Sequence, residues 1–434
     1  MEATPPVTPN LVRPKEIPGA RRVGRNTLET LLFRGLSTPV ALLLVVIQGR
    51  FLEPEGRGRF VLVVLSVTIL ARLLGQLGVA VTSRAREGDV RPLAQRGLAL
   101  ALVLGLVGVA IVIAIGAAVD AIGLRLSLIA APALIPNIVS ACVSGVLLGQ
   151  ARIRLWNYVQ TLPPLLTLVG MLIVVVALGH GVDAAIAVWT ASYFVTAAFA
   201  LAGTTDLWTP LRIPPLLDRV SRTIAAAGLV LGAVQIVNLI GYRIELFVLE
   251  HYEGVDDVGI YSIAMQAAES MWLVPAAVAT AVTGPVVHED EHGAARLIRN
   301  ACGRGILYTT AFAVAVGAAG PFVIPFAFGD EFRGAVRPLV LLLPGVVAYA
   351  PVSILVVYLS VRRSRPQLSL LVSIVGLVVT AAMSFLLIPP YGASGAAGAS
   401  AVGYAAGGVA AWVAFTRLAG LTLLGRRGEL SPVT

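Results

Sequence analysis

Five charged side chains lie inside segments that are otherwise apolar enough to cross a membrane: Arg34, Arg72, Arg243, Glu245 and Glu269. A charge at the centre of a membrane helix costs about 2.5–3.5 kcal/mol on insertion scales, so such residues usually bind a substrate, an ion or each other. A guanidinium is a planar donor that fits phosphate oxygens. A desolvated carboxylate can take up a proton or a small cation. These residue types therefore predict an anion site and an ion-coupling site.

Polar residues recur at helical spacing beside these charges. Residues three or four apart share one face of a helix, and three such faces are present: Thr68, Arg72 and Gln76; Gln235, Asn238, Tyr242 and Glu245; Ser262, Gln266 and Glu269. Hydrogen bonding between membrane helices explains scattered Ser and Thr, but it does not explain charges concentrated in a few segments. We therefore predict a central cavity with Arg34 and Arg72 on one side and Glu269 on the other.

The residue types divide this predicted site into two functions. The predicted substrate-binding residues are Arg34, Arg72, Gln76, Gln235, Asn238, Arg243 and Gln266. The ion-coupling candidates are Glu245 and Glu269, with a proton or a sodium ion as the coupling ion.

The composition identifies the protein class. Of 434 residues, 57% are hydrophobic and 13% are charged, whereas a soluble domain has about 25% charged residues. We predict an all-α integral membrane protein embedded in a lipid bilayer. The two cysteines, Cys142 and Cys302, exclude a disulfide framework and a thiolate metal site, and we expect no cofactor or metal. The net charge of +9 is attributed to loop arginines and not to nucleic-acid binding.

Apolar runs of about 20 residues predict about twelve membrane helices. They lie near 27–49, 59–82, 96–119, 126–149, 155–178, 182–203, 222–249, 258–284, 297–319, 336–360, 367–388 and 395–416. With both termini in the cytoplasm, most of the 32 Lys and Arg residues lie on the cytoplasmic side. The outer loops then hold Arg50, Arg57, Arg59, Arg125, Arg333 and Arg337. This bias predicts cytoplasmic termini in a multi-pass protein of the cell (inner) membrane.

The chain repeats itself weakly. A shift of 201 residues aligns Gly58 with Gly259 and Val79 with Thr280, and a shift of 211 aligns Arg152 with Arg363. We predict two pseudo-symmetric six-helix lobes, an N-lobe at 26–210 and a C-lobe at 211–420, with the site between them near the midplane. Residues 1–25 are proline-rich and basic, which predicts a disordered cytoplasmic tail and no signal peptide. Residues 421–434 are predicted to form a cytoplasmic C-terminal tail.

Three stretches resemble a known family: GRFLEPEGRGRFVLVV at 49–64, YRIELFVLEHYEGVDDVGIYSIA at 242–264 and LLIPPYGASGAAGASAVGYA at 386–405. Through them the chain resembles the polysaccharide-flippase branch of the multidrug/oligosaccharidyl-lipid/polysaccharide exporter superfamily. The resemblance implies a V-shaped, two-lobed transporter that flips a polyprenyl-pyrophosphate-linked oligosaccharide outward by alternating access, for cell-surface polysaccharide synthesis. It also implies that the first, second, seventh and eighth helices line the cavity and that cationic residues there attract the pyrophosphate. The family often has aspartate where Glu245 stands.

Three other functions remain open. A cation-coupled drug antiporter of the same superfamily would depend on cavity carboxylates. A membrane glycosyltransferase would need a larger outer loop than any predicted here. The sequence HEDEH at 288–292 matches H-E-x-x-H, in which His288 and His292 would bind zinc and Glu289 would act as general base if the segment were helical. The competing interpretation is an acidic loop between two membrane helices. We expect a monomeric transporter and not an enzyme.

Overall fold

The computed structural model describes residues 20–84, 90–210 and 214–419. These ranges are helical and contain no strand. The first eight helices are α1 (Ala20–Leu74), α2 (Leu77–Arg84), α3 (Val90–Ala118), α4 (Leu124–Ala130), α5 (Leu134–Gly149), α6 (Ile153–Met171), α7 (Val182–Ala202) and α8 (Thr205–Trp208). The others are α9 (Arg219–Gly241), α10 (Ile244–Glu253), α11 (Val255–Glu269), α12 (Leu273–His288), α13 (Glu291–Phe328), α14 (Val336–Val356) and α15 (Pro366–Leu418).

Short 3-10-helical or π-helical segments connect or extend several of these helices. They are η2 (Ala131–Ala133), η3 (Leu172–Ala177), η4 (Ser270–Trp272), η5 (Asp330–Ala335) and η6 (Val357–Arg362). Helix α1 begins at Ala20, before the predicted start of the N-lobe at residue 26. Residues 20–25, which were predicted to belong to the disordered tail, are therefore helical. Residues 1–19 and 420–434 lie outside the described residues, so for them the tail predictions stay predictions.

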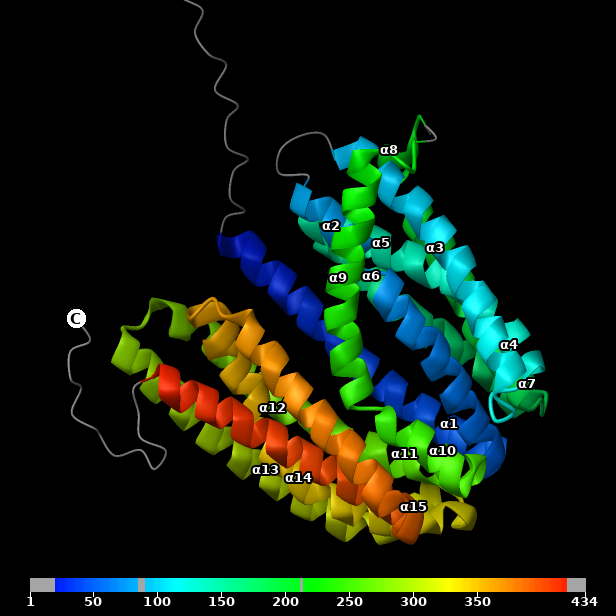
Figure 1. Cartoon of the computed structure of the whole chain (residues 1–434), viewed down its shortest axis with the longest axis vertical. Coiled ribbons are helices and arrows are strands. Elements are labelled where there is room, and N and C mark those ends of the chain that lie inside the picture. The colour runs from blue at the N-terminus through cyan, green and yellow to red at the C-terminus, as the bar shows by residue number, and fades with distance from the viewer. Residues whose placement is uncertain (1–19, 85–89, 211–213, 420–434) are drawn as a thin grey trace, which may run out of the picture.

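Two helices are long enough to cross a membrane twice. Among the described residues, nine stretches are long and apolar enough to span a bilayer, and two of them, Pro39–Arg84 and Gln367–Leu418, have 46 and 52 residues. One crossing needs about 20. The backbone leaves helical geometry at Glu53 (φ 59°) in α1 and at Gly392 (φ 53°) in α15, and each ribbon reverses direction (Figure 1). The all-helical membrane class is confirmed, whereas twelve spans and cytoplasmic termini stay predictions.

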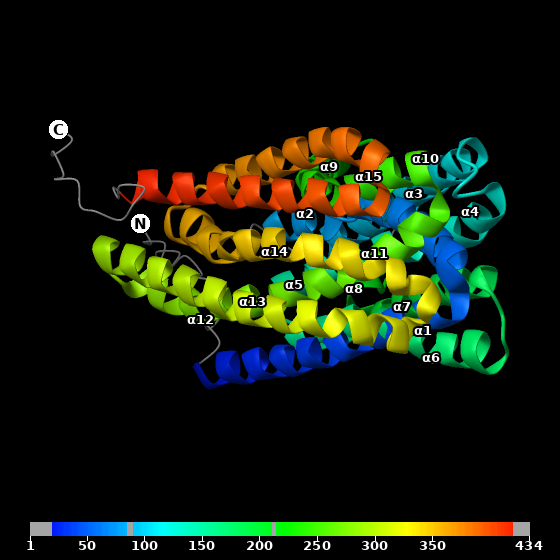
Figure 2. The same cartoon turned by 90° about the horizontal axis from the view of Figure 1, so that it is seen from below.

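The helices form two groups with α1 and α9 between them (Figures 1 and 2). Helices α2–α7 make one group and α11–α15 the other. Helix α1 contacts both α6 and α11, and α9 contacts both α2 and α15. The groups meet near α10, α11 and the bend of α1, and they diverge toward the end at which α1 begins (Figure 1). The two groups therefore approach each other most closely at one end of the bundle (Figure 1).

Asp218 fixes the start of α9 against the first group. Its carboxylate accepts a hydrogen bond from the Ser221 backbone N–H at 2.8 Å and another from the Arg96 guanidinium of α3 at 3.0 Å. The hydrogen bond from Ser221, followed by the pairing with Arg96, lowers the pKa of the Asp218 carboxyl. An aspartate at this position satisfies one of the free N–H groups of the first helical turn.

The contact between α1 and α11 is reciprocal. A Cβ atom placed on Gly58 would lie 2.0 Å from the carbonyl oxygen of Val255, and one on Gly259 would lie 2.0 Å from the carbonyl oxygen of Pro54. Pro54 and Val255 are separated by the same 201 residues as the two glycines. A twofold axis between two copies of one contact produces this reciprocity. Only glycine allows the two backbones to approach so closely.

Candidate functional site

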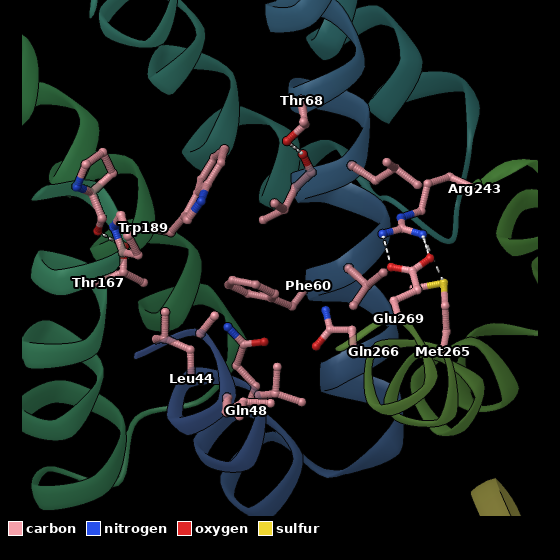
Figure 3. A pocket seen from close by; sticks show the side chains of 18 of the residues that line it. Leu44, Gln48, Phe60, Thr68, Thr167, Trp189, Arg243, Met265, Gln266 and Glu269 are labelled. Atoms are coloured by element: carbon pink, nitrogen blue, oxygen red, sulfur yellow. Dashed lines mark hydrogen bonds and ion pairs between the residues drawn. The ribbon is translucent and has the colours of Figure 1, made fainter. Parts of the chain in front are cut away.

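A cavity of about 710 Å³ lies where α1 meets α6, α7 and the α10–α11 segment (Figure 3). Its volume falls within the range of about 300–1,000 Å³ that is usual for small-molecule sites. Most of the lining is apolar. Helix α1 contributes more lining residues than any other helix, and Pro163 and Pro164 of α6 and Trp189 of α7 also line the cavity. The polar lining residues are Ser37, Gln48, Thr68, Thr167, Tyr193, Arg243, Gln266, Glu269 and Ser270.

An ion pair forms one wall of the cavity. The Arg243 guanidinium donates to both carboxylate oxygens of Glu269, at 2.6 and 2.8 Å (Figure 3). The two side chains are 21% and 14% exposed, so the pair faces the cavity but is largely shielded. Arg243 also donates to the backbone carbonyl of Tyr242 at 2.7 Å. A fork-to-fork pair of this kind is strong and directional, and here it occupies the donors that an anionic ligand would need.

Four aromatic residues pack behind this pair. Tyr242, Trp272, Tyr349 and Tyr404 contact one another in all six combinations, with ring centroids 5.3–6.0 Å apart. The Tyr404 hydroxyl lies 3.5 Å from Glu269 Oε1. Because these rings pack together from the end of α9, η4, α14 and α15, they support the Arg243–Glu269 pair from behind.

A second cation lies directly behind the cavity lining. Arg57 of α1 is 0% exposed. Its Nε donates to Ser262 Oγ at 3.1 Å, its Nη2 donates to Gln266 Oε1 at 3.1 Å, and its Nη1 donates to Gln48 Oε1. Gln48 and Gln266 both line the cavity. No ion pair joins Arg57 to an acidic side chain in the described part of the chain, so its three acceptors hold the guanidinium without neutralising it.

Glu245 is the most buried carboxylate near the cavity. It is 0% exposed and lies at the start of α10, behind the lining residue Leu246. Its Oε1 accepts a hydrogen bond from the Tyr261 hydroxyl at 3.5 Å, and that hydroxyl lies 3.2 Å from Ser400 Oγ. Its Oε2 has no hydrogen-bond partner among the described residues. A buried carboxylate oxygen without a partner is costly unless a proton or a cation joins it.

The structure brings together only part of the predicted site. Arg243, Gln266 and Glu269 line the cavity, and Glu245 lies behind it. The Arg72 side chain is exposed and is not among the lining residues, and neither are Gln76 and Gln235. Asn238 donates to the carbonyl of Val234 at 3.3 Å and borders a separate, much smaller pocket. The Arg34 side chain lies outside the described residues.

Arg57 is the functional candidate that the sequence analysis missed. It was predicted to lie in an outer loop, and that prediction is wrong, because α1 resumes after the break at Glu53 and buries Arg57 against α11. The signal was its position between Gly56 and Gly58. Glycines flanking an arginine allow the neighbouring backbone to close over it, as Gly58 does with Val255.

The HEDEH segment is not a single helix. Helix α12 ends at His288, Glu289 is extended (ψ 156°), and α13 begins at Glu291, with Asp290 accepting a hydrogen bond from the Gly293 N–H at 2.8 Å. The zinc hypothesis required both histidines on one helix face, so its geometric premise is wrong. The His288 side chain lies outside the described residues.

The comparisons with known proteins agree on a fold and a family. The family described as polysaccharide biosynthesis protein matches residues 23–289. The structure is similar to a lipid II flippase MurJ in an inward closed conformation, with a TM-score of 0.76, 12% identity and coverage of 89% of this chain and 87% of that one. No curated protein matches the sequence.

Transporters of the MOP superfamily share the same fold. An inward-facing multidrug resistance MATE family transporter matches with a TM-score of 0.70 and 15% identity, covering 88% of this chain and 94% of that one. An outward-facing MATE family transporter matches with a TM-score of 0.59 and 18% identity, covering 91% and 95%. Identities this low establish the common fold, and the fold agrees with the family match.

Proposed function

Because the chain belongs to the polysaccharide biosynthesis protein family, we propose that it is a flippase for a lipid-linked oligosaccharide. The proposed substrate carries a polyprenyl-pyrophosphate group and moves from the inner to the outer leaflet by alternating access, for cell-surface polysaccharide synthesis. The observation that carries this proposal is Arg57, a fully buried cation held by three neutral acceptors immediately behind the cavity lining. A positive charge without a carboxylate partner favours an anion in the adjacent cavity.

Arg243, the cation in the cavity wall, could switch between a carboxylate partner and a bound substrate. Arg243 is paired with Glu269. A pyrophosphate could replace the carboxylate as the partner of the Arg243 guanidinium, since both can offer two oxygen atoms that accept its two parallel hydrogen bonds. Release of the pyrophosphate would then be assisted when Glu269 pairs with Arg243 again. Gln48 and Gln266, whose amide oxygens face Arg57, have amide N–H groups left to donate to a sugar or phosphate oxygen.

The remaining predicted substrate residues belong to the same proposal. Arg72 lies near Tyr193, which lines the cavity, although the Arg72 side chain itself does not line it. We propose that Arg34, Arg72 and Gln76 guide the head group into the cavity, and that Gln235 and Asn238 contact it in another conformation.

The proposal also includes the topology. The chain would form two six-helix lobes, divided near residue 210, and would therefore cross the membrane twelve times. Both termini would lie in the cytoplasm, and the protein would be a monomer in the cell membrane. The reciprocal contact between Gly58 and Gly259 supports a repeat related by a twofold axis. The higher TM-score to the inward-facing than to the outward-facing MATE family transporter supports a cavity that faces the cytoplasm in this conformation.

We further propose that Glu245 couples the flippase to an ion. One arginine, Arg243, lies among two carboxylates, Glu245 and Glu269, so the cluster has one negative charge in excess when both are ionised. The free Oε2 of Glu245 is the position at which a proton or a sodium ion would balance that charge. We expect Glu245→Gln to keep basal flipping but to lose its stimulation by a proton or sodium gradient. Glu253→Gln, an exposed carboxylate on the same helix, should respond as the wild type does; an equal response in Glu245→Gln would refute the coupling role.

The experiment that tests the function compares two substrates in proteoliposomes. One is a fluorescent oligosaccharide on polyprenyl pyrophosphate, and the other is the same oligosaccharide on an uncharged polyprenyl ether. We expect the pyrophosphate-linked substrate to flip at least about tenfold faster, since a buried guanidinium contributes more than about 1.4 kcal/mol to binding a phosphate. Equal rates would remove the role of the cationic cavity. Export of a cationic dye without flipping of either lipid would identify the antiporter.

A drug–cation antiporter is the second candidate, favoured by one observation. The fold is shared with MATE family transporters, and the cavity wall contains the carboxylate of Glu269 with Glu245 behind it. Against it, Glu269, the carboxylate of the described lining, is already paired with Arg243, and Arg57 directly behind the lining has no acidic partner in the described residues. An organic cation would therefore compete with Arg243 for Glu269.

A further inference from the structure

A further pocket borders α12 and shares no lining residue with the central cavity. It has a volume of about 280 Å³ and lies between α12 and α13. Val278, Ala281 and Val282 form its α12 wall, and Asn300, Arg304 and Tyr308 are its polar residues on α13. None of its lining residues belongs to the central cavity, whose lining reaches only Leu273 at the start of α12. The two sites are therefore separate.

The polar residues of this pocket lie in a row along α13. Asn300, Arg304 and Tyr308 are spaced by four residues, so they lie above one another on one face of α13. All three side chains are exposed. No hydrogen bond or ion pair joins any of them to another residue within the described ranges. An amide N–H, a guanidinium and a phenol O–H are all donors, and together they present donors without a protein acceptor.

The depth of Arg304 matches that of a lipid phosphate. Arg304 is the last charged residue of α13 before the uncharged run from Gly305 to Phe328, which is long enough to cross the hydrocarbon core. Arg304 therefore lies at the boundary between the hydrocarbon and the head groups. The next residues, Ile306 and Leu307, are 40% and 63% exposed, so this face of α13 meets lipid tails. The aliphatic α12 wall offers the same environment to an acyl chain.

From this combination we infer that the α12–α13 pocket binds an anionic phospholipid of the bilayer. Arg304, Asn300 and Tyr308 bind the phosphate oxygens, and the first acyl methylenes lie against Val278, Ala281 and Val282. Basic pockets between membrane helices are a recurrent form of anionic-lipid site. Because α12 also borders the central cavity through Leu273, a lipid bound here contacts the helix that must move if the two groups of helices rock. This inference does not depend on what the central cavity transports.

The test measures the increase in Tm of the full-length protein in detergent on titration with phosphatidylglycerol or phosphatidylcholine. The wild type should be stabilised at lower concentrations of phosphatidylglycerol than of phosphatidylcholine. Arg304→Gln should weaken the apparent phosphatidylglycerol affinity about fivefold, the effect of one arginine at an anionic lipid surface. Ala281→Trp, which fills the pocket without changing any charge, should weaken it as well. Arg299→Gln removes an equal charge from an exposed residue outside the pocket and should bind as the wild type does.

Three outcomes would overturn the inference. Equal affinities for the two phospholipids would exclude recognition of charge. An equal loss in Arg299→Gln and Arg304→Gln would assign the effect to the general positive charge of the helix end. Displacement of phosphatidylglycerol by polyprenyl phosphate at far lower concentration would assign the pocket to the transported lipid. A variant that is less stable before titration does not obscure these results, because the affinity is read from the concentration dependence.

Discussion

Replacing Arg57 by methionine is expected to lower the rate of flipping of the pyrophosphate-linked substrate about 30-fold or more. A buried unit charge acting on a phosphate across the lining contributes about 2 kcal/mol at an effective dielectric constant of about 20, and this corresponds to about 30-fold in affinity. Arg57→Lys should retain part of the activity, because it keeps the charge. In the wild type, each of the three guanidinium nitrogens of Arg57 donates to a different residue: Ser262, Gln48 or Gln266. The single ammonium group of a lysine cannot reach all three acceptors.

The control for this variant is two residues away. Arg59 is exposed and pairs with Glu55 at 2.9 Å, so Arg59→Met removes the same charge from the same helix and should flip substrate normally. A loss of similar size in Arg59→Met would contradict the assignment.

A loss of folding must be separated from a loss of charge. Arg57→Met leaves three acceptors without donors, at about 1–3 kcal/mol for each buried group, so part of the protein is expected to misfold. The triple variant Arg57→Met/Gln48→Leu/Gln266→Leu removes two of these acceptors and should recover Tm. It should not recover flipping. If the triple variant flipped the substrate at the wild-type rate per folded protein, Arg57 would have only a structural role.

Replacing Glu269 by glutamine is expected to lower KM and kcat together, each about tenfold. The substitution removes the carboxylate to which the Arg243 guanidinium donates two hydrogen bonds, from Nη1 to Oε1 at 2.6 Å and from Nη2 to Oε2 at 2.8 Å. The pyrophosphate no longer competes with that carboxylate, so it binds more tightly. Release becomes slower, because nothing recaptures Arg243. A change of about tenfold corresponds to about 1.4 kcal/mol, which is within the range for a hydrogen-bonded charge pair.

The reverse variant makes this prediction specific. Arg243→Gln should raise KM, and the double variant Arg243→Gln/Glu269→Gln should show an interaction free energy that differs from the sum of the single changes. Arg333→Gln breaks an ion pair with Asp330 in which both side chains are mostly exposed, and it should leave both constants unchanged. A fall in kcat with no change in KM for Glu269→Gln would show that the carboxylate does not compete with the substrate.

The sequence by itself determined the class of the protein and the apolar segments that form its helices. Hydrophobicity accumulates along a run of residues independently of tertiary contacts, so the apolar segments could be identified without a structure. The cost of a charge in hydrocarbon is equally local, and it pointed to Arg243 and Glu269, which line the cavity, and to Glu245, which is buried near it. The helical spacing of Ser262, Gln266 and Glu269 also predicted a real face, since these residues bind Arg57 and Arg243.

Only the tertiary structure decided which side of each helix faces the cavity. Arg72 and Arg57 lie on the same helix, yet one side chain is exposed and the other is completely buried. The difference arises at the break at Glu53, which sets the direction of the second half of α1, and at the contact with α11 through Gly58 and Gly259. These contacts join residues about 200 positions apart. Spacing within one helix specifies which residues share a face, but the orientation of that face depends on the packing of distant helices.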